Sequence, residues 1–245
     1  SARADAVIPR LIHDAGKPVR TPPARPGLHK WRDAVKDRLF YRSAPLGLMR
    51  TEFLVEKRLG FVPELPVGED LELSIALYAQ GRVRVQRSGA AYVIGSSAKD
   101  RVTMSLAPLQ RELQCVDAVW NGVAESLSVA EKVALGTKLL RIHIFGAAYY
   151  RAQAERWLDG DREQIARVSQ AVLAAAPGCE APLSRADRDL LDALLDTDMP
   201  DAEVNRLALA RRRFGRPNTL LPRELDQILN REAPLRFMVA SALVR

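Results

Sequence analysis

The segment that most constrains the fold of this 245-residue chain is residues 61–81, where a proline-bearing loop passes into a short helix. Pro63 and Pro66 stiffen the loop, because the proline ring fixes φ and removes an amide donor. Apolar residues then recur at helical spacing, which predicts a helix from about residue 69 to residue 79. Gly81 is a typical helix stop, and two short strands are predicted after it, at residues 82–85 and 91–94.

Downstream of this unit the pattern becomes helical almost throughout. The predicted helices are residues 106–123, 129–158, 162–175, 185–195, 202–214 and 222–244, the last with a break at Pro234. Four residues have the type and position of helix N-caps, namely Ser128, Asp161, Ser184 and Asp201. The change of pattern predicts two parts, a mixed α/β part at residues 1–105 and a helical region at residues 106–245.

The start of the chain is predicted to be irregular, because prolines interrupt residues 1–27 at Pro9, Pro18, Pro22, Pro23 and Pro26. Residues 28–42 then carry apolar positions at helical spacing, which predicts a helix. A turn at residues 43–47 follows, and Thr51 is placed to cap a short helix after it.

Charge and composition exclude several classes of protein. The chain has 37 basic and 30 acidic residues, a net charge of +7, but most arginines are spread along predicted helices. The one dense cluster, residues 211–216, is either a solvated helix end or a contact with phosphate or acidic lipid. No nucleic-acid-binding motif is present, so no nucleic-acid partner is expected, while a peripheral membrane contact is a further expectation.

Cysteine content and hydropathy point to the cytoplasm. Two cysteines and three widely separated histidines provide neither a disulfide framework nor a cysteine or histidine metal site. No window has the roughly 18 uninterrupted apolar residues that a membrane-spanning helix needs. We therefore expect a cytoplasmic protein whose membrane association, if any, is peripheral.

The acidic pair Glu69 and Asp70 stands where the rigid loop enters the helix. Acidic residues are common at helix starts because they complement the partial positive charge there, so a structural cap is one interpretation. A carboxylate held at such a junction beside a sheet can also accept a proton from a substrate hydroxyl. Asp70 is accordingly the strongest catalytic candidate in the sequence.

The order of segments around this pair has a wider resemblance, over about residues 38–105. A turn, an exposed arginine, a glycine-phenylalanine and proline loop, the acidic pair, a helix, Gly81 and two strands follow one another. This order resembles the acceptor-side half of family 2 glycosyltransferases with the GT-A fold. The resemblance implies an enzyme that moves a sugar from a nucleotide-sugar donor to a hydroxyl acceptor such as a glycan, lipid or polysaccharide precursor. It implies that Asp70 is the general base of an inverting transfer and that Glu69 orients neighbouring groups or binds the acceptor.

Three further residues are substrate-binding candidates by the same resemblance. Gly47 ends the acceptor-side turn, and Arg50 follows it where the family often has a basic residue. Arg50 could contact a diphosphate or an anionic acceptor, or pair with Glu52 or Glu56. Arg101 lies in a segment that resembles the loop covering the bound donor.

The donor-binding half of the family pattern is not seen in this chain. In the family an Asp-x-Asp motif holds a divalent metal, Mg²⁺ or Mn²⁺, on the donor diphosphate, whereas no such motif precedes Asp70 here. Three later strings, at Asp159, Asp187 and Asp196, are interpreted as caps and solvated faces. The predicted fold class is therefore α/β, an incomplete GT-A half-domain followed by a mainly α-helical region.

Two interpretations of this incompleteness stay open. The chain is either the carboxy-terminal part of a longer transferase, which we favour, or a remnant without donor binding. In both cases the isolated chain is expected to be inactive. The alternative from another functional class is a helical module for protein interaction or membrane docking, with a vestigial transferase segment.

Overall fold

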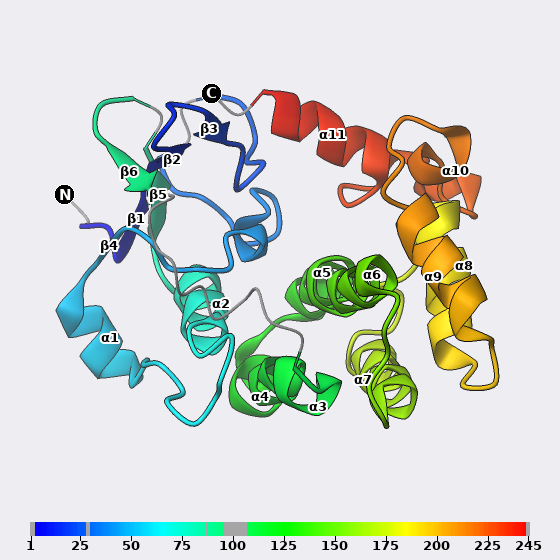
Figure 1. Cartoon of the computed structure of the whole chain (residues 1–245). Helices are drawn as coiled ribbons and strands as arrows, with labels where there is room; N and C mark the ends of the chain where they lie inside the picture. Colours follow the sequence, from blue (N-terminus) through cyan, green and yellow to red (C-terminus); the bar gives the residue numbers. More distant parts are fainter. Residues whose placement is uncertain (1–2, 28–29, 87, 96–106, 244–245) are drawn as a thin grey trace.

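The structure is a computed structural model that describes residues 3–27, 30–86, 88–95 and 107–243. Figure 1 shows the strands gathered with α1 and α2 on one side of the molecule and the later helices on the other. The predicted α/β class, with a strand-bearing part followed by helices, is confirmed. One hydrophobic core nevertheless runs through both parts, from Ala6 near the start to Ala208 in the helical region.

Six short strands form two small three-stranded sheets. In the first sheet β1 is central, antiparallel to β4 and parallel to β5; in the second, β2 is central, antiparallel to β3 and parallel to β6. The predicted strands after Gly81 are confirmed as β5 and β6. The bounds are β1 Ala6–Ile8, β2 Arg10–His13, β3 Pro18–Val19, β4 Leu48–Met49, β5 Val83–Val85 and β6 Ala91–Ile94.

The prediction of an irregular start is wrong, since three of these strands lie within residues 1–27. Proline does not prevent them because each proline avoids a position that would interrupt a strand. Pro9 lies between β1 and β2, and Pro18 is the first residue of β3, places where strands tolerate a missing amide. The alternation in β1 is clear, with Ala6 and Ile8 buried and Val7 half-buried between them.

The predicted helix at residues 28–42 is also wrong. Among its described residues, 30–42, the backbone forms turns and one 3-10 turn, η1 (Leu39–Tyr41). The reason is the fully buried Asp37 carboxylate, which accepts hydrogen bonds from the amides of Arg25 and Asp33 and from the guanidinium groups of Arg25 and Arg32. Side-chain bonds of this kind compete with the helical ladder for the backbone donors.

The central helix of the strand-bearing part is α2 (Leu71–Gln80), which confirms the predicted helix and its stop at Gly81. Its sequence predicted one apolar face, but the structure buries it nearly all round, from Leu71 through Tyr78. A helix that is apolar on all sides is an interior helix. The N-cap residue of the preceding helix α1 (Thr51–Lys57) is Arg50, which makes no side-chain capping bond, so the predicted cap at Thr51 is wrong.

A junction built on Asp5 connects α1, α2 and the first sheet. The buried Asp5 carboxylate accepts hydrogen bonds from the amide and guanidinium of Arg82, just before β5, and from the guanidinium of Arg50. The backbone of Asp5 also bonds to both residues. The hydrogen bonds from Arg82, above all, lower the pKa of Asp5 well below its usual range. Gly81 allows this junction to close, because a Cβ there would lie 2.6 Å from the Leu77 carbonyl oxygen.

The helical region confirms most of the predicted helices. The long predicted helix at residues 129–158 is continuous to Ala154 but contains a π-helical turn, and the predicted helix at 222–244 is reduced to a 3-10 turn and a final helix that begins at Pro234. The bounds are α3 Leu109–Glu112, α4 Gln114–Val123, η3 Ala124–Ser126, α5 Val129–Leu139, η4 Leu140–Ile144, α6 Phe145–Ala154, α7 Asp161–Ala175, α8 Arg185–Leu195, α9 Asp201–Ala210, α10 Pro217–Leu220, η5 Leu225–Leu229 and α11 Pro234–Ala242.

Two of the four predicted N-caps are confirmed. Ser128 forms a full capping box with Glu131, and the Ser184 hydroxyl accepts a bond from the Asp187 amide at 3.0 Å. The predicted caps at Asp161 and Asp201 are wrong by one position, because each is the first residue inside its helix. Acidic residues in the first turn still complement the helix dipole.

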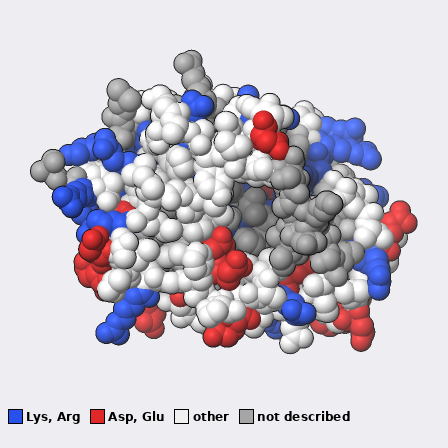
Figure 2. Space-filling model, turned by 60° about the vertical axis from the view of Figure 1, so that its left-hand side comes forward, with Lys and Arg blue, Asp and Glu red and all other residues white. Residues whose placement is uncertain are grey.

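Charges are widely distributed over the surface. On the face in Figure 2, basic side chains lie mainly toward the edges, and acidic side chains form several separate groups, most of them in the lower half. The start of the cluster at residues 211–216 is not a free basic patch, because Arg211 pairs with Asp187 at 2.7 Å and is nearly buried. Within the described ranges, no helix combines the length and apolar character needed to cross a bilayer.

We predict that Asp37→Asn lowers the free energy of unfolding by about 3 kcal/mol at neutral pH, because it leaves Arg32 buried without its counter-charge. Burial raises the pKa of Asp37, but the hydrogen bonds from Arg25 and Asp33 outweigh it and lower the pKa overall. The stabilisation is therefore present above the unfolded-state value of 3.8 and is lost as pH falls through the lower folded-state value.

Chemical denaturation of wild type and Asp37→Asn across this pH range measures the effect. The matched control is Asp33→Asn, since the exposed Asp33 side chain bonds only to nearby backbone amides and its loss should cost about 1 kcal/mol or less. Equal losses from the two variants would contradict the role given to Asp37.

Candidate functional site

The acidic pair lies at the start of α2, as the sequence predicted. Asp70 is the N-cap residue of α2, yet its side chain makes no capping hydrogen bond. Its backbone carbonyl instead accepts bonds from the amide and hydroxyl of Ser74. The Asp70 carboxylate is half-buried and free of the capping role, whereas Glu69 is exposed and its carbonyl accepts a bond from the Val62 amide at 2.9 Å.

The loop before the pair is held by close packing on α4. Gly68 has φ +78°, and a Cβ placed there would lie 2.8 Å from the Cβ and 2.9 Å from the Sγ of Cys115. Both its backbone conformation and its contact therefore require glycine. Cys115 is buried, and burial raises the pKa of its thiol to about 11, so it remains a neutral packing group.

The charge of a fully buried lysine, Lys138 of α5, acts on the Asp70 carboxylate. Its ammonium lies 2.8 Å from the Nε2 of His143, and no carboxylate of a described residue forms an ion pair with it. Burial lowers the pKa of Lys138 to about 7, while the negative charge of Asp70 acts to raise it. The lysine is therefore poised between its charged and neutral forms near neutral pH.

The π-helical turn η4 explains the contact between Lys138 and His143. In this turn the Phe145 amide bonds to the Leu140 carbonyl, the i to i+5 pattern of a π-helix. The same change of winding allows side chains five residues apart to meet. Burial and the neighbouring ammonium lower the pKa of His143 well below 6.5, so the imidazole is neutral and accepts a hydrogen bond from Lys138 through Nε2.

The pKa of Asp70 is raised by this environment. Burial contributes most and the nearby Glu69 charge adds to it, while the positive charge of Lys138 acts in the opposite direction. A carboxylate with a raised pKa binds a proton more strongly than an ordinary one, which suits a general base. Asp70 is thus a half-buried carboxylate without a capping bond, and the charge of an ionisable lysine acts on it.

The predicted substrate-binding residues Arg50 and Gly47 make their contacts with groups other than Asp70 and Lys138. Arg50 pairs with Asp5, not with Glu52 or Glu56, so that part of the prediction is corrected. Gly47 packs against the strand-bearing part, since a Cβ there would lie 2.4 Å from the Val7 carbonyl oxygen. Arg101 lies outside the described residues. Substrate binding by these three residues stays a prediction.

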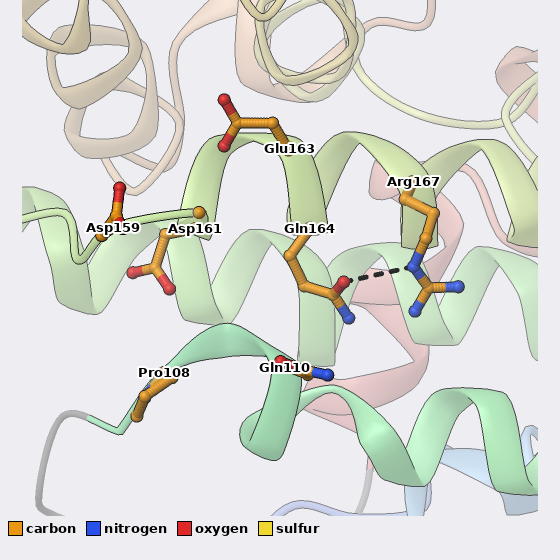
Figure 3. Close-up of a pocket in the computed structure, with 8 residues that line it drawn as sticks. Pro108, Gln110, Asp159, Asp161, Glu163, Gln164 and Arg167 are labelled. Atoms are coloured by element: carbon orange, nitrogen blue, oxygen red, sulfur yellow. Dashed lines mark hydrogen bonds between the residues drawn. The ribbon is translucent and has the colours of Figure 1, made fainter.

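The interpretation of the later Asp-x-Asp strings as caps and solvated faces agrees with the exposure of Asp159, Asp189, Asp196 and Asp198, but it is wrong for the buried Asp161 and Asp187. Asp161 is buried and accepts bonds from Arg151 at 2.6 Å and from the Leu109 amide at 2.8 Å. It borders a hollow of about 340 Å³ between the starts of α3 and α7, which Figure 3 shows together with Asp159 and Glu163. Asp187 is likewise buried and pairs with Arg211. These carboxylates hold the helical region together.

No metal site is formed by the described residues. Among them, no group of three or more histidine, cysteine, aspartate or glutamate side chains is arranged to hold an ion. The Asp161 carboxylate is already occupied by Arg151. The divalent metal expected for the complete enzyme therefore stays a prediction.

Sequence reasoning missed Asp5 and the function of Lys138. Asp5 lies within residues 1–27, which were predicted to be irregular, and nothing in its local sequence indicates partners at Arg50 and Arg82. Lys138 does carry a signal, because it interrupts an otherwise apolar helical stretch. A lysine on such a face is buried only when it is paired or its pKa is shifted.

Comparison with known proteins identifies the fold. No family profile and no curated protein matches the sequence. Among solved structures, the chain is similar to S. aureus TarS 1–349 in complex with UDP-GlcNAc, with a TM-score of 0.64 and 15% identity over 85% of this chain and 60% of that one. TarS 1–349 alone gives a TM-score of 0.63 and 16% identity, and its complex with UDP gives 0.58 and 15%, each over 87% of this chain and 60% of that one.

The fold is therefore glycosyltransferase-like, a partial GT-A half-domain followed by helices. The particular likeness is to TarS, and the chain spans about 60% of the length of the TarS structures it matches. At this level of identity the likeness concerns the fold.

The buried lysine generates a prediction about stability and pH. Because the folded-state pKa of Lys138 is lowered from 10.5 to about 7, the unfolded chain binds more protons between these values and stability should rise with pH there. Lys138→Met should remove this rise and stabilise the protein near pH 6 by about 1–4 kcal/mol.

Denaturant unfolding at several pH values measures the difference between wild type and variant. Lys132→Met is the matched control, since Lys132 lies on the same helix α5 and is partly exposed. Parallel pH profiles for wild type and Lys138→Met would show that Lys138 does not carry the shifted titration.

Proposed function

We propose that this chain is the acceptor-side part of an inverting family 2 glycosyltransferase, with Asp70 as its general base. The observation that carries the proposal is the Asp70 carboxylate, half-buried and without a capping bond at the start of α2, in a glycosyltransferase-like fold. An acidic residue kept only as a helix cap would be expected to bond to the first amides of the helix.

The proposed reaction needs one proton transfer and one displacement. Asp70 takes the proton from the acceptor hydroxyl while the oxygen forms a bond to the anomeric carbon of the sugar. The bond from that carbon to the nucleoside diphosphate breaks on the opposite face, and the leaving group departs with the bonding electrons. Glu69, exposed beside Asp70, is proposed to bind the acceptor or orient it.

The donor and the acceptor are proposed as classes. TarS has been crystallised with UDP-GlcNAc and with UDP, which supports a nucleotide sugar as the donor and makes UDP-GlcNAc the first to test. The acceptor is proposed to be a hydroxyl of a glycan, lipid or polysaccharide precursor, reached from the cytoplasm. To bind a substrate anion, Arg50 would have to release its ion pair with Asp5.

Donor binding is proposed to require residues outside this 245-residue chain. The chain spans about 60% of the TarS structures, and no Asp-x-Asp precedes Asp70. A divalent metal on the donor diphosphate remains an expectation for the complete enzyme. The 245-residue chain alone is therefore expected not to turn over nucleotide sugars.

We predict that Asp70→Asn lowers kcat for sugar transfer at least 10²-fold, because the acceptor hydroxyl loses its base. The assay uses the complete product of the gene that encodes this chain, with UDP-GlcNAc and Mn²⁺, and detects UDP release and glycosylated acceptor. Donor KM should be unchanged, since Asp70 is proposed to act on the acceptor. Glu69→Gln should have a smaller effect.

Asp159→Asn is the matched control, because Asp159 is an exposed acidic residue in the helical region. Wild-type kcat in Asp70→Asn would exclude the proposed base. Robust transfer by the 245-residue chain alone, abolished by Asp70→Asn, would show that no further donor-binding part is needed.

A further inference from the structure

The carboxy-terminal helix α11 has one face packed on the protein and one face exposed. On the inner face Phe237 packs edge-on against Tyr41, with ring centroids 4.7 Å apart, and its ring lies near the guanidinium groups of Arg38 and Arg141. Ala240 is buried on the same side. Figure 1 shows α11 at the outer edge of the molecule, between α10 and the strand-bearing part.

The outer face of α11 continues an apolar surface that begins in η5. Leu235, Val239 and Leu243 recur at intervals of four residues, and Val239 is 61% exposed. In η5, Leu225 and Leu229 are 58% and 72% exposed. Single exposed leucines are unremarkable in folded proteins, but a contiguous set on neighbouring elements indicates an interaction surface.

This surface borders a groove of about 420 Å³ between η5, α11 and the segment that contains Arg25 and Arg38. Every residue that lines the groove is either apolar or an arginine, so no carboxylate faces it. Of the three acidic side chains of the nearby segment, Glu224 and Asp226 are exposed outside the groove, and Glu232 is buried behind it and pairs with Arg38.

Two of the lining arginines have uncompensated charge. Arg231 and Arg236 each donate to a backbone carbonyl, of Lys36 and Leu229 respectively, and neither forms an ion pair with a described residue. Burial lowers the pKa of the neighbouring Arg38, and the charges of Arg231 and Arg236 lower it further although Glu232 opposes them. The rim of the groove is therefore positively charged.

We propose that η5 and α11 form a docking surface for an anionic lipid bilayer. Protruding leucine and valine side chains would enter the interface between headgroups and acyl chains, while Arg231 and Arg236 would contact lipid phosphates. Apolar side chains flanked by arginines are the pattern of interfacial helices, whose binding combines buried apolar area with attraction to anionic lipid. The surface acts independently of the proposed sugar transfer.

The shape and charge of the surface favour a bilayer over other occupants. Its most exposed residues are large apolar side chains, as Leu229 and Val239 are, and a broad fluid layer can cover such side chains together with the arginines beside them. A second copy of the chain meeting this face symmetrically would bring Arg231 and Arg236 against their own equivalents without a carboxylate between them.

The docking surface on η5 and α11 is distinct from the basic cluster at residues 211–216. Arg211 is used by Asp187, and the guanidinium of Arg212 lies 4.7 Å from the ring centroid of Tyr149 and 5.7 Å from that of Phe214. This cluster therefore has less free charge than its sequence indicated. Its arginines provide a matched control for charge removal.

Co-sedimentation with vesicles tests the proposal on the 245-residue chain. Wild type should bind vesicles of phosphatidylglycerol and phosphatidylcholine and not vesicles of phosphatidylcholine alone, and added salt should weaken binding. Arg231→Gln with Arg236→Gln should lower the affinity about 10- to 30-fold. Leu229→Ser with Val239→Ser should weaken it through the loss of apolar insertion.

The control Arg212→Gln with Arg213→Gln removes the same charge and should retain at least half of the wild-type binding. Circular dichroism and thermal unfolding check that each variant is folded, and a folded variant is required for the comparison. No binding to anionic vesicles, equal binding to neutral ones, or equal losses in test and control variants would overturn the proposal. So would reversible dimerisation in sedimentation velocity that Leu229→Ser with Val239→Ser abolishes, since a second copy would then cover the surface.

Discussion

The arrangement of the strand-bearing part depends on one buried carboxylate, that of Asp5. It bonds to Arg50 at the start of α1 and to Arg82 between α2 and β5, so three segments far apart in sequence meet at one charge. Such a group is stable in the interior only while its partners are present, which makes the junction specific. Because the junction fixes one end of α2, it also determines where Asp70 lies at the other end.

A second constraint is the placement of charge around Asp70. The helix α2 is buried nearly all round, yet its N-cap residue, Asp70, makes no side-chain capping hydrogen bond. The π-helical turn holds a neutral His143 against Lys138. Lys138 is the cation of α5 that acts on the Asp70 carboxylate, and with a pKa of about 7 it is only partly protonated near neutral pH. The result is a carboxylate that is partly desolvated and weakly compensated, as a proton acceptor requires.

The local patterns were sufficient to predict much of the fold. The unit from Asp70 to β6 and the successive helices follow from apolar spacing, glycine and serine signals, and these are local physical causes. The segment at residues 28–42 could not be predicted in this way, because Asp37 replaces helical bonds with side-chain bonds to residues up to twelve positions away. Lys138 was visible as a charge in an apolar stretch, but its relation to Asp70 depends on tertiary packing that no spacing rule contains.

The most direct test of the account is the pKa of the Asp70 carboxyl group, measured by carbon-13 NMR in wild type and in Lys138→Met. Burial and Glu69 should raise the pKa above the ordinary aspartate value of 3.8, and loss of the Lys138 charge should raise it further. A wild-type pKa at or below the ordinary value, unchanged in Lys138→Met, would contradict a desolvated base tuned by the buried lysine.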